Sequence, residues 1–105
     1  MQIGFILTKS PSEQGFQTFM TFAQLHVSND NISIYLVGNG VYSAAKNYKN
    51  PDLEGIFKNS KVYVYGNDLK ARGIDGQIKD GINVFEQYDH LVRDVMGNFD
   101  QVISF

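Results

Sequence analysis

Apolar runs typical of strands alternate along the whole chain with segments typical of helices, and this order constrains the fold more than any other feature. The strand-like runs are Ile3–Leu7, Ile32–Val37, Val62–Tyr65, Ile82–Phe85 and Val102–Phe105. The first run is continuously apolar, which is typical of a strand buried on both faces. No two-residue hairpin joins two runs. The alternation therefore predicts one α/β domain over residues 1–105, a three-layer α/β/α sandwich with a mainly parallel five-stranded sheet.

Helical signals fill the segments between these runs. Ser10 fits an N-cap, Pro11 a first helical position and Glu13 the closing member of a capping box, so a helix is expected to start there. Asn67 and Asp68 are expected to cap a further short helix. The other expected helices are Val41–Lys46, Leu53–Phe57 and Gln87–Met96. The last is the clearest amphipathic helix, with its apolar residues at Tyr88, Leu91, Val92, Val95 and Met96.

Composition excludes several classes of function. The 105 residues contain no cysteine, which rules out disulfides, thiolate zinc sites, iron–sulfur clusters and cysteine nucleophiles. The net charge is −2 and no basic patch is visible, so direct nucleic-acid binding is not expected. No apolar stretch approaches a membrane span. We expect a cytoplasmic protein without a metal, a cofactor or a membrane contact.

The loops that follow the strands are the places to look for a site, because ligands bind beyond the carboxyl ends of parallel strands. Gly38-Asn39-Gly40 fits either a simple strand-to-helix turn or an anion contact through backbone N–H groups. His26 and His90 are interpreted as surface residues. Asp89 and Arg93, four positions apart, are interpreted as a solvated ion pair. No residue pattern indicates an independent active site.

Aromatic residues exceed what one small core readily needs. Phe22 widens the apolar stripe of the first helix, and Tyr63 and Tyr65 alternate with valines in the third strand-like run. Phenylalanine and tyrosine are common in the buried centres of protein interfaces. These three residues are therefore interface candidates, with ordinary core packing as the alternative.

Two stretches resemble the DsrE/DsrF/DsrH superfamily of sulfur-relay proteins, which includes TusB, TusC and TusD. The strand that leads into Gly66-Asn67-Asp68-Leu69-Lys70-Ala71-Arg72-Gly73-Ile74 resembles the DsrH/TusB branch, and the segment 38–44 resembles the glycine-valine turn of the family. Order and length agree over nearly the whole chain. The resemblance implies a DsrE-like α/β/α fold and assembly into homo- or hetero-oligomers.

The resemblance also implies which chemistry this chain lacks. Sulfur-carrying DsrE and TusD members place a cysteine at the end of the third strand, where a nearby helix N-terminus favours the thiolate. Tyr65 stands at that position, and a phenol cannot form a persulfide. We therefore expect a non-catalytic subunit, not an enzyme, of a DsrE/Tus-type sulfur-relay assembly linked to 2-thiolation of the tRNA wobble uridine. Its expected partners are cysteine-bearing DsrE/DsrF-like subunits or further copies of itself.

The alternative hypothesis is a homo-oligomeric DsrE-like module that binds a small ligand or an anion. Its ligand or interface loop would comprise Gly38, Asn39, Gly40, Tyr42, Asn67, Asp68 and Arg72.

Overall fold

The computed structural model describes residues 1–105 and contains one five-stranded sheet in the order β4-β3-β2-β1-β5. The strands are β1 (Gln2–Leu7), β2 (Asn31–Leu36), β3 (Lys61–Tyr65), β4 (Asn83–Phe85) and β5 (Gln101–Ser104). Every pairing between neighbours is parallel. The sequence-based expectation of a parallel α/β sheet is confirmed, and the sheet contains no antiparallel strand.

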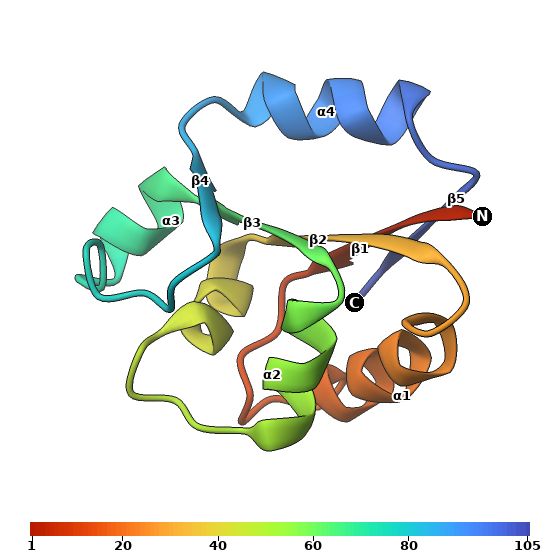
Figure 1. The fold of residues 1–105 in the computed structure, drawn as a ribbon. Coiled ribbons are helices and arrows are strands. Elements are labelled where there is room, and N and C mark those ends of the chain that lie inside the picture. Colours follow the sequence, from red (N-terminus) through yellow and green to blue (C-terminus); the bar gives the residue numbers. More distant parts are fainter.

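Helices cover both faces of the sheet. Helices α1 (Phe16–His26) and α2 (Pro51–Lys58) lie on one face, and α4 (Tyr88–Gly97) lies alone on the other (Figure 1). The 3₁₀ helix η1 (Gly38–Ala44) follows β2, and the short helix α3 (Gly66–Ala71) follows β3. None of these helices combines the length and apolar character needed to cross a bilayer.

The two faces bury very different amounts of apolar surface. The core between the sheet and α1 and α2 contains 17 buried residues, including Phe5, Phe19 and Leu53. The core under α4 contains four, which are Tyr35, Val37, Phe85 and Leu91. Because apolar burial is the main favourable term in folding, most of the stabilising free energy comes from the first face.

Two helix starts differ from the sequence-based expectation. Helix α1 begins at Phe16 behind Gly15, whose φ of 97° is not helical, so Ser10 is not its N-cap. The Glu13 side chain still accepts from the Ser10 N–H at 3.0 Å, but it closes an isolated turn rather than a helix. Helix α3 begins at Gly66 without a side-chain cap, because the Asp68 carboxylate is engaged elsewhere.

The expected helix Val41–Lys46 is also different. The backbone turns immediately after β2 into η1, so Gly38, Asn39 and Gly40 belong to a 3₁₀ helix that ends at Ala44. By contrast, Asn50 caps α2 by accepting from the N–H groups of Asp52 and Leu53. A cap such as Asn50 forms between residues that are neighbours in the sequence. The 3₁₀ helix η1 instead packs against β1, which is distant from it in the sequence.

Candidate functional site

The loops after β2 and β3 meet at the carboxyl edge of the sheet, as expected for neighbouring parallel strands. The Gly38 N–H donates to the Asp68 carboxylate at 2.7 Å, across 30 positions of sequence. The N–H at the start of the glycine-rich turn therefore does bind an anion, and that anion is the Asp68 carboxylate of the same chain. The contact joins η1 to α3.

Arg72 extends this contact into a network. Its guanidinium lies 3.4 Å from the Asp68 carboxylate and donates two hydrogen bonds to the Asn39 side-chain oxygen, at 3.0 and 3.2 Å. The guanidinium carbon also lies 5.9 Å from the centre of the Tyr42 ring. Together with Gly38, five of the seven predicted loop residues are thus brought together, and most of their polar groups contact one another.

Glu13 is a member of the network that sequence reasoning did not place there. Its carboxylate accepts from the Asn39 amide at 2.9 Å as well as from the Ser10 N–H. These hydrogen bonds, with that from the Ser10 backbone the largest cause, lower the pKa of Glu13 below its ordinary value. The only sequence signal was its spacing from Ser10, which indicated a local cap. We call Glu13, Asn39, Asp68 and Arg72 the carboxyl-edge network.

Close backbone approach explains the second glycine of the turn. A Cβ atom at Gly40 would lie 2.0 Å from the Leu7 carbonyl oxygen at the end of β1. A Cβ atom at Gly66 would lie 2.7 Å from the Glu86 carboxylate. Gly40 therefore permits η1 to lie directly against β1, and this packing brings the loops after β1 and β2 together.

Tyr65 lies at the end of β3, immediately before α3, as the resemblance implied. Its ring stacks on Phe85 with 5.2 Å between centroids and meets Tyr88 edge-on at 5.5 Å. Its hydroxyl accepts a hydrogen bond from the Asn67 amide at 3.0 Å. The phenol thus fills the space between β4 and the start of α4.

The other two interface candidates lie on opposite faces of the sheet. Phe22 is 39% exposed on α1 and packs against Phe105 with 5.7 Å between ring centroids. Tyr63 is half-buried beneath α4 and stacks on Tyr35 at 5.0 Å. These two residues therefore cannot belong to one continuous patch. Phe22 offers the more exposed apolar surface.

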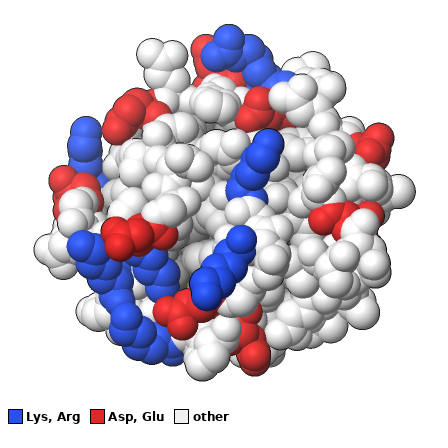
Figure 2. All heavy atoms as spheres, in the orientation of Figure 1, with Lys and Arg blue, Asp and Glu red and all other residues white.

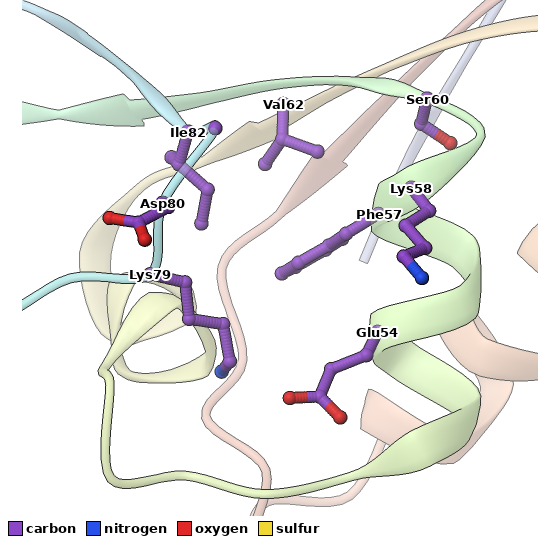
Figure 3. Close-up of a pocket in the computed structure, with 9 residues that line it drawn as sticks. Glu54, Phe57, Lys58, Ser60, Val62, Lys79, Asp80 and Ile82 are labelled. Atoms are coloured by element: carbon purple, nitrogen blue, oxygen red, sulfur yellow. The ribbon is translucent and has the colours of Figure 1, made fainter.

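The carboxyl-edge network lines none of the four cavities of the fold. The largest, of about 590 Å³, lies between α2 and the segment that enters β4, and Figure 3 shows Phe57 and Ile82 pointing into it. Lys79 lies at its wall, but its ammonium already donates to the carbonyls of Ser43 and Ala45 at 2.8 and 3.0 Å. Burial lowers the pKa of Lys79. This lysine therefore joins η1 to the chain before β4.

A smaller polar cluster lies under α4. The Tyr35 hydroxyl donates to the Asp94 carboxylate at 2.5 Å, and His90 lies 3.3 Å from the same carboxylate. Burial, and then the hydrogen bond to Asp94, raise the pKa of Tyr35 above its ordinary value.

No group of three or more metal-ligating side chains is present. Figure 2 shows several lysine or arginine side chains next to one another at the lower left of the visible face, with aspartate or glutamate beside them, and charges of both signs elsewhere on this face.

Comparison with known protein families identifies the family of this chain. The family model described as "DsrH like protein" matches residues 9–101. The chain belongs to the DsrH-like family. The match includes the whole carboxyl-edge network and Tyr65, and the family supports a sulfur-relay-related protein. A search of curated protein sequences finds no match.

Solved structures share the fold of this DsrH-like chain at low sequence identity. A protein of unknown function from Methanobacterium thermoautotrophicum, MTH1491, superposes with a TM-score of 0.80 at 16% identity and covers 97% of each chain. The ychN protein of E. coli gives 0.77 at 18% identity over 100% of both chains. BT1422, a protein of unknown function from Bacteroides thetaiotaomicron, gives 0.74 at 13% identity over 99% of this chain and 94% of its own. At these identities the comparison establishes the fold alone.

Proposed function

We propose that this DsrH-like chain is a non-catalytic, cysteine-free subunit of a DsrE/Tus-type sulfur-relay assembly that serves 2-thiolation of the tRNA wobble uridine. The observation that supports this most directly is Tyr65, which occupies the end of β3 immediately before α3. The family resemblance puts the sulfur-carrying cysteine of catalytic members at that position. Any sulfur handled by the assembly is then carried by a partner.

The surroundings of Tyr65 support a structural role for its side chain. A persulfide carrier needs a thiolate that can reach a donor and an acceptor. The Tyr65 ring instead packs between Phe85 and Tyr88, and its hydroxyl accepts from Asn67. The side chain therefore stabilises the edge of the sheet that, in a sulfur-carrying relative, would hold the reactive group.

The carboxyl-edge network supports a docking role rather than ligand capture. The Gly38 N–H and the Arg72 guanidinium, which are the natural anion donors of this edge, already bind Asp68 and Asn39. No cavity opens between them. A surface with satisfied polar groups and a fixed shape is suited to contact with another protein chain, because little ordering entropy is lost on binding.

A sulfur-loading experiment tests the non-catalytic part of the proposal. The chain is incubated with a cysteine desulfurase and cysteine, and its intact mass is measured without reductant. We expect no added sulfur on the wild type and one added sulfur on Tyr65→Cys. Met96→Cys, which places a thiol at an 83% exposed position of α4, controls for non-specific loading. Sulfur on the wild type, or equal loading of the two cysteine variants, contradicts the proposal.

Co-assembly tests the subunit part. The chain is expressed with cysteine-bearing DsrE-like and DsrF-like chains from the same organism, and complexes are weighed by native mass spectrometry. We expect a hetero-oligomer with a defined ratio of chains. Failure of the chain to form a complex with such partners would contradict the subunit role, even if the sulfur-loading experiment gives the expected result.

A further inference from the structure

Polar side chains gather at the amino ends of the strands, on the face of the sheet that carries α4. The register pairs Gln2 of β1 with Asn31 of β2, and Ser33 of β2 with Lys61 of β3. Side chains alternate along a strand and paired residues share a face, so all four lie on the same side as Tyr35, which packs under α4. This amino edge therefore presents two amides, a hydroxyl and an ammonium group together.

Helix α4 covers less of this face than its sequence pattern predicted. Leu91 is its one buried residue. Three apolar residues that were expected to face the core with Leu91 are exposed instead: Tyr88, Val92 and Met96. The expected Asp89–Arg93 ion pair also does not form. Because α4 is the one helix on this face (Figure 1), the polar side chains of the amino edge, Ser33 apart, stay exposed.

Ser33 is an unusual residue for its position. It lies in β2, the middle strand of the sheet, and is 9% exposed. Most buried hydroxyl groups have a hydrogen-bond partner in the protein, as Ser43 does by donating to the Gly40 carbonyl at 2.7 Å. The Ser33 hydroxyl makes no hydrogen bond within the chain. It lines two cavities, so its hydrogen-bonding capacity is available to a molecule that enters them.

The first cavity, of about 450 Å³, is lined by basic but not by acidic side chains, and we call it the amino-edge cavity. It includes all four polar residues of the strand ends. The end of α2 and the turn after it add three more: Lys58, Asn59 and Ser60. Lys58 also borders the larger cavity drawn in Figure 3. Neither Lys58 nor Lys61 makes an ion pair or a side-chain hydrogen bond, so two ammonium groups are free to bind an anion.

Two carboxylates near this cavity are engaged by other groups. Asp30 lies 2.9 Å from the His26 ring and 3.5 Å from the N-terminal ammonium. The Asp100 carboxylate accepts from the backbone N–H at the start of β1 at 2.7 Å. The lysines therefore keep their charge for a ligand, and lysine ammonium groups commonly bind phosphate as point charges.

The second cavity, of about 270 Å³, continues the first along β3, and we call it the inner cavity. The two cavities share three residues: Gln2, Ser33 and Lys61. The inner cavity extends to Tyr63, His90 and Asn98, whose polar groups can hydrogen-bond to hydroxyl groups of a ligand. Its one carboxylate, Asp94, already accepts from Tyr35 and Asn98. A molecule that fills both cavities has an anion at one end and a polar body at the other.

We propose that the amino edge of the sheet binds a small phosphate monoester whose body carries hydroxyl groups. Lys58, Lys61 and the Ser33 hydroxyl hold the phosphate. The body lies in the inner cavity beside Tyr63 and His90. Two ammonium groups match the charge of a phosphate monoester, which approaches −2 at pH 7. The site lies at the opposite edge of the sheet from the carboxyl-edge network, is independent of sulfur transfer and goes beyond the proposed function.

Calorimetric titration tests the ligand class. Ribose 5-phosphate, inorganic phosphate and ribose are each titrated into the full chain at low ionic strength. We expect saturable binding of ribose 5-phosphate at one site per chain and no measurable binding of ribose, because the charge supplies most of the affinity. Inorganic phosphate leaves the inner cavity empty, so we expect a Kd about fivefold higher. Added salt should raise both Kd values.

Matched substitutions test the residues, with folding checked by circular dichroism. Lys61→Gln removes one ammonium group and should raise the Kd for ribose 5-phosphate about tenfold. Lys46→Gln makes the same change of charge at an exposed residue outside all four cavities, and should change the Kd less than about twofold. Ser33→Ala keeps the net charge and should raise the Kd about fivefold through the lost hydrogen bond.

Four results would overturn the inference. The first is no saturable binding of ribose 5-phosphate, and the second is a wild-type Kd for Ser33→Ala. The third is an equal effect of Lys61→Gln and Lys46→Gln, which would indicate general charge attraction. The fourth is equal affinity for inorganic phosphate and ribose 5-phosphate, which would remove the body from the inner cavity. Sulfur loading at position 65 is measured separately, so none of these results decides the proposed function.

Discussion

Gly40 is the residue whose side chain, or lack of one, most directly shapes the carboxyl edge. Any Cβ atom there would lie 2.0 Å from the Leu7 carbonyl oxygen, a backbone atom that cannot rotate away. We expect Gly40→Ala to lower the free energy of unfolding by about 1–3 kcal/mol, measured by urea denaturation. Gly55→Ala is the matched control, since nothing lies within 4 Å of its added methyl group.

The control should respond in the opposite direction. Gly55 lies within α2, where alanine is favoured over glycine by about 1 kcal/mol. Gly55→Ala should therefore raise the free energy of unfolding. Equal stability of the two variants would show that η1 does not approach β1 as closely as described.

Glu13 gives the carboxyl-edge network a dependence on pH. Folding lowers its pKa below the ordinary 4.5, chiefly through the Ser10 backbone hydrogen bond and then the Asn39 amide. A lowered carboxylate pKa contributes stability above pH 4.5, and this contribution is lost as the pH falls through the folded pKa. We expect Glu13→Gln to be less stable than wild type at pH 7.

Acid unfolding provides the measurement for Glu13. The stability difference between wild type and Glu13→Gln should shrink as the pH falls from 4.5 through the lowered pKa of Glu13, because the Glu13 carboxylate of the folded protein becomes protonated over this range. Asp75→Asn, which alters an exposed carboxylate without a hydrogen bond in the chain, should leave the pH profile unchanged. A constant difference at all pH values would argue against the hydrogen bonds to Glu13.

At the scale of elements, α4 is held to the sheet by a small core and one polar contact. The Tyr35 hydroxyl donates to Asp94, and the core beneath contains four buried residues. Hydrogen bonds to charged groups contribute about 1.5–3 kcal/mol, and the Asp94 carboxylate that accepts this one is partly buried. We expect Tyr35→Phe to speed hydrogen exchange in α4 while leaving α1 and α2 protected. The Tyr63 hydroxyl makes no hydrogen bond in the chain, so Tyr63→Phe should leave hydrogen exchange unchanged in all three helices.

For the whole molecule, the unequal cores predict unequal responses to similar substitutions. Leu53 and Leu91 are both buried, but Leu53 belongs to the core of 17 residues and Leu91 to the core of four. Leucine to alanine changes cost about 2–5 kcal/mol, and less where the surroundings can collapse. We expect Leu53→Ala near the top of this range and Leu91→Ala near the bottom, measured by urea denaturation. The reverse order would contradict the assignment of α4 as the looser layer.

Much of the fold could be read from local patterns. The five strand-like runs were identified because each is a short apolar segment bounded by turn residues, and parallel pairing followed from the helices between them. The predicted start of α1 at Ser10 was wrong. Ser10 and Glu13 do form one hydrogen bond of a capping box, but Gly15 has a non-helical φ and the helix begins only after it. Sequence spacing alone does not distinguish a capped helix from a capped turn.

The amino-acid sequence by itself determined the order of strands and helices, the absence of thiol chemistry and the tyrosine at the end of β3. Only the tertiary structure decided that Asp68 binds Gly38, that Glu13 joins Asn39 and that the apolar arc of α4 divides into a buried and an exposed face. The physical reason is distance along the chain. Composition and periodicity describe neighbours, whereas these contacts join segments whose proximity depends on how the whole sheet is assembled.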